Sequence, residues 1–198
     1  YLADRGADVT VLEKASVGSG ATDRAAGGVR TQFTTEVGIS LSQESVAVWE
    51  TFEEDFGVDI EYRRPGYLYV ARTEATADLF REAIPIQNDL GVDSRFLDPE
   101  EATEYVPGLR TEQYVGTAYC PTDGFADPHL GLQGFSRAAT AAGAEVHTGV
   151  EVTDVRRDGE AVVGVESTEG GYEADFVVNA AGSWSPKVAA MAGVDLPV

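Results

Sequence analysis

A carboxylate at the end of a short apolar run is the first residue of this chain whose position indicates chemistry. Residues 8–13 read Asp-Val-Thr-Val-Leu-Glu, and this β-branched run predicts a buried strand of a parallel sheet that ends at Glu13. In dinucleotide-binding folds, an acid at the carboxyl end of the second strand accepts hydrogen bonds from ribose hydroxyl groups. Glu13 occupies that place, and the alternative is an acid that merely ends a strand in solvent.

A segment of small residues follows Glu13 and ends just before an arginine. Residues 18–28 read Gly-Ser-Gly-Ala-Thr-Asp-Arg-Ala-Ala-Gly-Gly. Small side chains leave the backbone N–H groups open, which suits close approach to a phosphate or a flat ring. Val29 and Arg30 come directly after the segment, whereas a flexible linker is seldom followed at once by such residues. The segment is therefore predicted to bind a ligand.

Helices and strands in alternation must position these residues. Residues 1–6 read as the end of a helix that stops at Gly6, and a helix end leading into a strand is the second half of a βαβ unit. Further helices are predicted at about 35–56 ended by Gly57, at 74–90 with a kink or division at Pro85, in a short segment capped by Asp98, and from Asp127 to about Gly143. Further strands are predicted at 62–71, 114–119, 145–147, 151–155, 161–166 and 176–178, the last returning to the first sheet.

The strand predicted at 62–71 has alternating side chains. Tyr67 and Tyr69 fall on one face, and Leu68 and Val70 fall on the other. This pattern is typical of an antiparallel strand.

The chain is strongly acidic, and its acids are spread along its length. It has 34 Asp and Glu residues against 14 Lys and Arg residues, a formal net charge of −20, and only Lys14 and Lys187 are lysines. An acidic coat repels itself at low ionic strength and is screened at high salt, so we expect a salt-loving, halophilic source. The same charge argues against nucleic acid and anionic membranes as partners, because both need basic patches.

Cysteine and apolar content indicate a reduced, cytoplasmic compartment. Cys120 is the only cysteine, which excludes a disulfide within the chain, and it is expected to be a small buried residue. No apolar run approaches the roughly 20 residues that a membrane-spanning helix needs. His129 and His147 lack further ligands at metal-binding spacing, so no metal site is predicted.

Four motifs in order carry a family resemblance. They are residues 9–14, residues 18–30, the pairs Asp123-Gly124 and Asp127-Pro128, and residues 179–185, Asn-Ala-Ala-Gly-Ser-Trp-Ser. Together they resemble the D-amino-acid oxidase superfamily of FAD-dependent oxidoreductases, and the chain is most similar to its sarcosine oxidase, glycine oxidase and dimethylglycine dehydrogenase branch. The resemblance covers nearly the whole chain.

The resemblance implies an FAD cofactor and assigns residues to it. Glu13 would bind the ribose, with Lys14 in the same motif. The remaining cofactor-binding residues would be Gly20, Ala21 and Thr22 at the diphosphate and ribityl chain, Ala26, Gly27 and Gly28 beside the isoalloxazine, Val152 against adenine, and Ala181, Gly182 and Trp184 in the last motif. Each small residue also has a simpler explanation as a packing or turn residue.

The resemblance assigns a catalytic role to Arg30. In sarcosine-oxidising relatives, an arginine at the matching point binds the substrate carboxylate, and a planar guanidinium suits that bidentate contact. The alternative is that Arg30 forms an ion pair with one of the chain's many carboxylates. Arg24 is expected to be a surface or cofactor-side residue.

The resemblance also implies the fold: α/β (α+β overall), with an FAD-binding Rossmann-like domain and an inserted antiparallel-sheet substrate domain. Residues 1–56 and 127–198 would form the two parts of the FAD-binding domain, and residues 57–126 part of the substrate domain. Since the ribose-binding acid lies about 20 residues after the glycine fingerprint, we expect the chain to be truncated at its start, and also at its end. Such a fragment would bind FAD weakly by itself.

The implied function is FAD-dependent oxidation of a C–N bond in an amino acid or N-methyl amine, with sarcosine, glycine or a D-amino acid as the type of substrate. A homo- or hetero-oligomer is compatible with this. The alternatives are another enzyme class with the same FAD fold, such as a prenyl reductase, and a non-catalytic interaction subunit. The sequences that flank this chain in its gene discriminate between these readings.

The charge predicts that the folded state depends on salt. Raising KCl from about 0.1 M to 2 M or more shortens the Debye length severalfold and screens the repulsion among the acids. We therefore expect circular dichroism to show a folded chain at high salt and loss of structure at low salt. Equal stability in both buffers would contradict this expectation.

Overall fold

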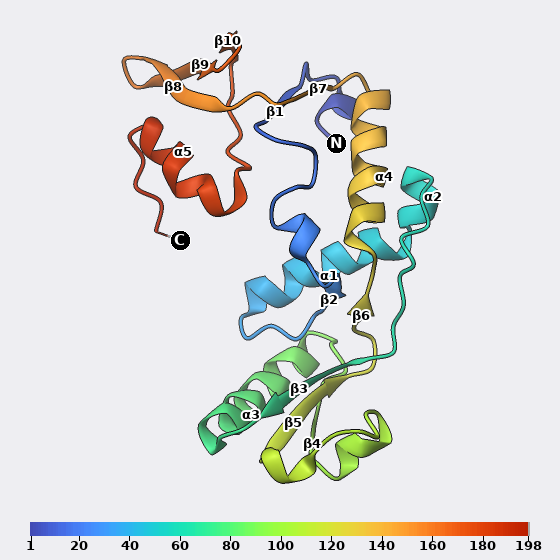
Figure 1. The fold of residues 1–198 in the computed structure, drawn as a ribbon. Coiled ribbons are helices and arrows are strands. Elements are labelled where there is room, and N and C mark those ends of the chain that lie inside the picture. The colour runs from blue at the N-terminus through green and yellow to red at the C-terminus, as the bar shows by residue number, and fades with distance from the viewer. Residues whose placement is uncertain (198) are drawn as a thin grey trace. The chain divides into compact units, whose positions relative to one another are not determined.

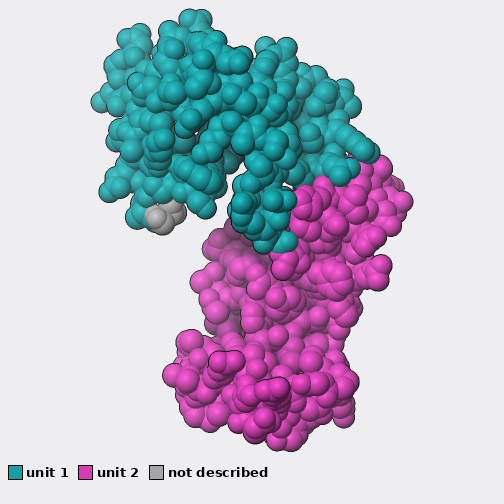
Figure 2. All heavy atoms as spheres, in the orientation of Figure 1, with its two compact units in different colours: residues 1–25, 132–198 teal, residues 26–131 magenta. Residues whose placement is uncertain are grey.

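The computed structural model describes residues 1–197 and divides into two compact units (Figures 1 and 2). Unit 1 comprises Tyr1–Ala25 and the chain from Leu132 onward, and unit 2 comprises Ala26–Gly131. Both contain helices and strands, which confirms the predicted mixed class. The unit boundaries follow residues 25 and 131, whereas the predicted domain boundaries follow residues 56 and 126; the assignment of domains to cofactor and substrate stays a prediction.

Unit 1 is built on two small sheets. Strands β1 (Thr10–Glu13) and β7 (Glu145–Thr148) pair in parallel, with Glu13 opposite Thr148 at their carboxyl ends, as expected for the strand that carries Glu13. Strands β8 (Val152–Asp158), β9 (Ala161–Ser167) and β10 (Gly170–Glu173) form an antiparallel sheet in the order β10-β9-β8. The helical elements of this unit are the 3-10 helices Ala3–Arg5, Thr22–Arg24 and Gly182–Trp184, helix α5 (Ser185–Met191), and the part of helix α4 (Pro128–Ala141) from Leu132 onward.

Residues 176–178 do not form the predicted strand. Phe176 is 88% exposed and Val178 is 74% exposed, and neither pairs with a strand in the part of the chain that the structure describes. Their composition is typical of a strand, but a strand also needs a neighbour for its backbone N–H and C=O groups. Within residues 1–197, β1 pairs with β7 alone, so no such neighbour is present and the prediction was wrong.

Two helices replace the single helix predicted at 35–56. Helix α1 (Glu36–Glu50) begins after Thr35, whose hydroxyl accepts a hydrogen bond from the Gly38 N–H at 3.1 Å. Helix α2 (Phe52–Phe56) ends at Gly57, which has a φ of 66° and confirms the predicted stop. Thr51 separates the helices because its own backbone leaves the helical region, and its hydroxyl bonds to the Ala47 carbonyl at 3.4 Å and to the Asp55 carboxylate at 2.6 Å.

Unit 2 also contains a three-stranded antiparallel sheet. Its order is β3 (Tyr67–Ala71), β5 (Gly116–Cys120) and β4 (Arg95–Leu97), and α3 (Glu74–Asp89) packs along it (Figure 1). Tyr67 and Tyr69 lie opposite Cys120 and Ala118, and the Tyr69 ring lies 6.3 Å from that of Phe80 in α3. The predicted alternation of the tyrosines is thereby confirmed.

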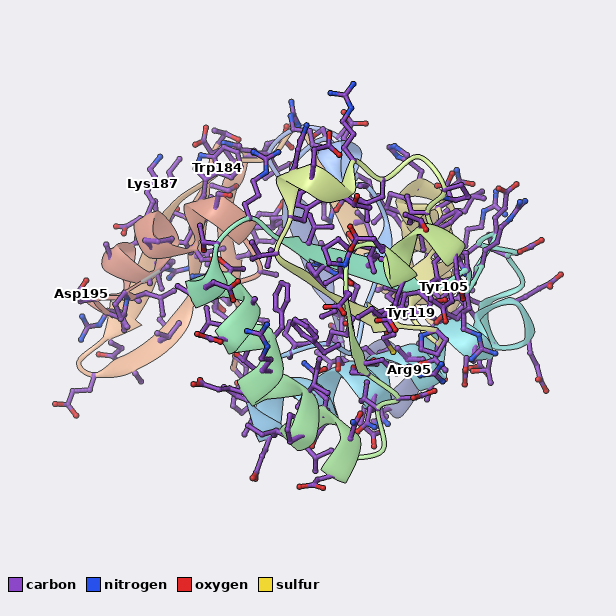
Figure 3. The ribbon with its side chains drawn as sticks, turned by 90° about the horizontal axis from the view of Figure 1, so that it is seen from below. Arg95, Tyr105, Tyr119, Trp184, Lys187 and Asp195 are labelled. Atoms are coloured by element: carbon purple, nitrogen blue, oxygen red, sulfur yellow. The ribbon has the colours of Figure 1, made fainter. Side chains whose placement is uncertain are left out.

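The other face of this sheet carries a separate aromatic pair. The rings of Tyr105 and Tyr119 stack with centroids 4.0 Å apart, and Arg95 lies opposite Tyr119 in the strand register (Figure 3). Burial raises the pKa of Tyr119, with a smaller contribution from Tyr105. Tyr119 and Tyr67 therefore belong to different surfaces.

A short strand pair and the start of a helix lie at the two ends of unit 2 in the sequence. Strand β2 (Gly28–Val29) pairs in an antiparallel manner with β6 (Gly124–Phe125). Helix α4 (Pro128–Ala141) begins at Asp127, whose carboxylate accepts hydrogen bonds from the N–H groups of His129 at 2.8 Å and Leu130 at 3.0 Å. The remaining 3-10 helices are Glu101–Glu104 and Thr111–Gln113.

The helix predicted to open at Asp98 is shorter than expected. Only the 3-10 helix beginning at Glu101 forms, and Asp98 donates its N–H to the Glu101 carboxylate at 2.9 Å. The cap side chain is therefore Glu101 rather than Asp98, because a Glu three residues into such a turn can reach back to the preceding N–H.

Gly27 is required by the pairing of β2 with β6. It has a φ of 73°, and a Cβ at this position would run into the carbonyl oxygen of Ala126. We expect Gly27→Ala to lower the free energy of unfolding by about 1–3 kcal/mol from the backbone strain alone. The matched control is Gly108→Ala, where a Cβ would have no atom within 4 Å and the change should stay within about 0.5 kcal/mol. Equal stability of the two variants in urea unfolding would contradict this explanation.

Candidate functional site

The carboxyl end of β1 presents a carboxylate that is only partly used by the protein. Glu13 is half-buried, and its Oε1 accepts a hydrogen bond from the Ala15 N–H at 2.8 Å. Its Oε2 has no hydrogen bond within residues 1–197. The backbone behind it is fixed, because Val150 donates its N–H to the Glu13 carbonyl and Gly149 donates to that of Ala15, both at 3.0 Å. Glu13 can therefore accept hydrogen bonds from a ligand.

Lys14 and Trp184 come together from opposite ends of the sequence. The Lys14 ammonium lies 4.1 Å from the centroid of the Trp184 ring. Such a cation–π contact is worth about 0.5–1 kcal/mol at an exposed site. Trp184 is 48% exposed and lies near Lys187, which pairs with Glu151 at 3.8 Å (Figure 3). The first and last motifs of the resemblance thus meet within unit 1.

The loop after β1 is held by its own arginine. Arg24 donates hydrogen bonds from one guanidinium nitrogen to the carbonyls of Ser19 at 3.0 Å and Gly20 at 2.7 Å. Ala21 and Thr22 lie at the start of the 3-10 helix that these bonds close. Arg24 therefore holds the conformation of this loop. A Cβ added to Gly20 would meet no other atom within 4 Å, so the backbone is open there.

The last motif forms a similarly open turn. The Asn179 side chain accepts from the Ala181 N–H at 3.2 Å and donates to the Ser185 carbonyl at 2.9 Å. Gly182 has a φ of 55°, and a Cβ there would also meet nothing within 4 Å. Val152 is a half-buried residue at the start of β8, opposite Ser167.

These residues of unit 1 fit a nucleotide cofactor. A carboxylate with a free oxygen suits ribose hydroxyl groups, and open glycine backbones suit a diphosphate. Gly20 has no packing partner that would explain its missing side chain, whereas the left-handed φ of Gly182 also favours glycine. Their roles toward FAD remain predictions.

In unit 2, the three small residues before Arg30 differ in their surroundings. Ala26 is exposed. Gly27 is required by the strand pair, which explains a glycine at this position without a flavin. A Cβ on Gly28 would lie 3.5 Å from the Tyr67 ring and 3.7 Å from the Arg30 side chain. Gly28 therefore borders the group of side chains around Arg30.

Arg30 is held by two tyrosines. Its guanidinium donates a hydrogen bond to the Tyr69 hydroxyl, and its Cζ lies 5.3 Å from the Tyr67 ring centroid and 5.7 Å from that of Tyr69. Among residues 1–197, no carboxylate lies within ion-pair distance of it. The alternative of an ion pair is therefore absent from the described part of the chain.

Tyr69 is a neutral hydrogen-bonding group at neutral pH. Burial raises the pKa of its hydroxyl, and the neighbouring Arg30 acts in the opposite direction without reversing the shift. A neutral phenol both accepts from Arg30 and can donate to an anion beside it.

A buried carboxylate bonds to the two residues that follow Arg30, and the sequence analysis did not identify it as a site residue. Asp123 is 1% exposed and accepts hydrogen bonds from the Thr31 N–H at 2.9 Å, the Thr31 hydroxyl at 2.6 Å and the Gln32 side-chain amide at 3.3 Å. Its place beside Gly124 makes it look like an ordinary turn residue. Only its partners, about 90 residues earlier in the sequence, reveal its role.

Cys120 and His147 have partners within the protein. Cys120 is buried as predicted, 3.2 Å from the Thr122 hydroxyl. His147 lies 3.3 Å from the Glu145 carboxylate. Residues 1–197 contain no group of three or more His, Cys, Asp or Glu side chains that could hold a metal. No helix in this range is both long and apolar enough to cross a membrane.

Comparison with known proteins gives consistent matches. The FAD dependent oxidoreductase family, DAO, matches residues 1–198. Glycine oxidase of Geobacillus kaustophilus (strain HTA426) is 32% identical over 204 residues, which cover 100% of this chain and 54% of that protein. Mitochondrial dimethylglycine dehydrogenase of Mus musculus is 28% identical over 192 residues, covering 96% of this chain and 22% of that protein.

A solved structure supports the same relationship. The crystal structure of L-proline dehydrogenase from P. horikoshii matches with a TM-score of 0.88 and 34% identity, and the match covers 100% of this chain and 52% of that one. The chain thus spans about half the length of this structure and of the glycine oxidase, and a smaller share of the dimethylglycine dehydrogenase. With its whole length matched and its motifs in order, the chain belongs to the DAO family of FAD-dependent oxidoreductases.

Proposed function

We propose that the protein containing this chain uses FAD to oxidise the C–N bond of a small amino acid or N-methyl amino acid, and that Arg30 binds the carboxylate of that substrate. The observation that carries the proposal is the state of Arg30. In a chain with 34 acidic residues, its guanidinium contacts two tyrosines and no carboxylate within residues 1–197.

Three other arginines of unit 2 form short ion pairs, whereas Arg72, which is exposed, lies 5.9 Å from the Tyr114 ring centroid. Arg64 pairs with Glu50, Arg81 pairs with Asp78 at 2.7 Å, and Arg95 pairs with Asp93 at 2.6 Å. All three pairs lie at exposed positions. Arg30 is half-buried, and its remaining N–H donors are available to an anion. Because a desolvated guanidinium binds a carboxylate bidentately and strongly, this geometry supports an anion-binding role.

The relatives support the substrate class. Glycine oxidase, sarcosine dehydrogenase, 4-methylaminobutanoate oxidase, D-amino acid dehydrogenase and L-proline dehydrogenase are all named for compounds that carry both an amine and a carboxylate. A carboxylate anchor serves every member of this class. It therefore leaves the choice among these substrates to other side chains.

The division of labour in the proposed reaction follows from these contacts. FAD, when bound, supplies the two-electron acceptor for the hydride on the carbon beside nitrogen, and water then hydrolyses the imine of the substrate. Glu13 would accept hydrogen bonds from the ribose, and the open backbones at Gly20 and Gly182 would face the diphosphate. Arg30 and the Tyr69 hydroxyl would hold the carboxylate and so fix which C–H bond faces the flavin.

Arg30→Lys tests the carboxylate anchor. Lysine keeps the positive charge but loses the planar fork, and a lost charge-assisted contact costs roughly 1.5–3 kcal/mol. We expect kcat/KM of the full-length enzyme for the best substrate among sarcosine, dimethylglycine, glycine, D-alanine and proline to fall about ten- to hundredfold, with FAD content unchanged. Arg63→Lys is the matched control, because Arg63 is 68% exposed and lies in the same unit. Unaltered kinetics in Arg30→Lys would refute the anchor.

Glu13→Ala tests the cofactor site independently of the substrate. Loss of the ribose contact should weaken FAD binding by the full-length protein about ten- to hundredfold, measured by fluorescence titration. Glu145→Ala is the control, because Glu145 is an exposed acid at the opposite end of the paired strand β7. If the two variants bind FAD equally well, Glu13 is only a solvated strand end.

A further inference from the structure

We infer that Asp123 is a positioning residue that holds Arg30 and Tyr67 in the arrangement needed to receive a substrate carboxylate. The inference rests on the proposed function of Arg30 and adds a residue to it. The juxtaposition that carries it is a buried carboxylate whose hydrogen bonds go to the two residues directly after Arg30.

The surroundings of Asp123 are unusual for an acid. Its side chain is 1% exposed, and within the described residues no Lys, Arg or His lies within ion-pair distance of it. Burial of a carboxylate without a cation costs free energy unless hydrogen bonds replace the lost water. Here the donors are neutral: the Thr31 N–H, the Thr31 hydroxyl and the Gln32 amide. A neutral polar residue would be sufficient in an ordinary turn, so the buried acid indicates that its hydrogen bonds to Thr31 and Gln32 serve a further purpose.

These hydrogen bonds join three segments that are distant in the sequence. Asp123 holds residues 31 and 32 through its side chain, and its carbonyl accepts from the Gly66 N–H at 3.0 Å. Gln32 then donates the same side-chain amide to the Tyr67 carbonyl at 3.1 Å. The segment that carries Arg30 and the segment that carries Tyr67 are thus both tied to one turn.

The geometry at Arg30 depends on this tie. Its guanidinium lies over the rings of Tyr67 and Tyr69, which come from β3, whereas Arg30 itself follows β2. The β2–β6 pair contributes only the two positions Gly28 and Val29, so it fixes the backbone at Arg30 weakly. Asp123 directly precedes β6, and its hydrogen bonds to Thr31 and Gln32 further fix the backbone after Arg30. Loss of its hydrogen bonds should leave Arg30 charged but less well placed.

Asp123→Asn tests the inference with a side chain of the same shape. An amide can keep its oxygen at the Oδ1 position, where both Thr31 donors bond, but it then places an NH₂ group at the Oδ2 position, toward the Gln32 amide that now donates there. We expect KM of the full-length, FAD-loaded enzyme for its best amino-acid substrate to rise about tenfold, with kcat within about twofold. Preference for the amino acid over its carboxamide should fall by a similar factor, because the carboxamide does not use the anion-binding site. Amide hydrogen exchange of residues 30–32 should become faster.

Two further variants keep the result decisive. Thr31→Val removes one donor to Asp123, and we expect a threefold or smaller rise in KM in the same direction. Thr117→Val is the matched control, because Thr117 is a fully buried threonine of the same unit whose hydroxyl donates to the Leu97 carbonyl at 3.0 Å. It should lose stability but keep the wild-type preference for the acid. If Asp123→Asn does not fold, the comparison of Thr31→Val with Thr117→Val decides alone.

The outcomes separate this inference from the function beneath it. If Arg30→Lys keeps the preference of the wild type for the acid over its carboxamide, the proposed anchor itself is wrong. If Arg30→Lys loses that preference while Asp123→Asn and Thr31→Val keep it, only the positioning role is overturned. A loss in Thr117→Val equal to that in Thr31→Val would show a general effect of destabilisation and would also overturn it.

Discussion

The buried carboxylate of Asp123 is the constraint on which the arrangement of unit 2 around Arg30 depends. Removal of an ion from water costs several kcal/mol, and hydrogen bonds to a charged group return roughly 1.5–3 kcal/mol each. Asp123 has such bonds to Thr31 and Gln32, so the chain at these positions has little freedom to move away. Gln87 adds to this rigidity, since its buried amide donates to the Phe33 carbonyl at 2.8 Å. The residues after Arg30 are therefore held in place by buried polar contacts.

The absence of an acidic partner near Arg30 within the described residues is informative because the chain is rich in acids. Most ion pairs of the described chain lie on the surface, where each is worth about 0–1 kcal/mol and is screened by salt. Arg30 forms no such pair, because its neighbours are the rings of Tyr67 and Tyr69 and the Tyr69 hydroxyl instead of acids. A cation in such surroundings is less screened than one at the surface, and it should discriminate strongly in favour of a carboxylate.

Local signals explain which features could be predicted from the sequence. Gly57 and Asp127 mark helix ends through their own backbone or side chain, and the alternation of Tyr67 and Tyr69 follows from strand geometry alone. The end of a strand at Glu13 was predictable because residues 9–12 are a short β-branched run, whereas the role of Glu13 toward a cofactor stays a prediction. In each case, the information lies within a few neighbouring residues.

Features that depend on distant partners could not be predicted in the same way. Phe176 to Val178 have the composition of a strand but no neighbour to pair with in the described residues, so they stay exposed. Thr51 divides a helix because its own backbone leaves the helical region, and its hydroxyl bonds to the Ala47 carbonyl one turn earlier. Asp123 looks like a turn residue until Thr31 is brought against it from about 90 positions away. Family motifs pointed to its segment without indicating its role.

The central claim is that Arg30 receives a substrate carboxylate between Tyr67 and Tyr69. The most direct measurement is a crystal structure of the full-length, FAD-loaded protein with a bound amino acid under anaerobic conditions. We expect the carboxylate oxygens to lie within about 2.7–3.2 Å of the Arg30 guanidinium nitrogens, with the Tyr69 hydroxyl as a further donor. A carboxylate bound by other side chains, with Arg30 still in contact with the two tyrosines alone, would contradict the claim.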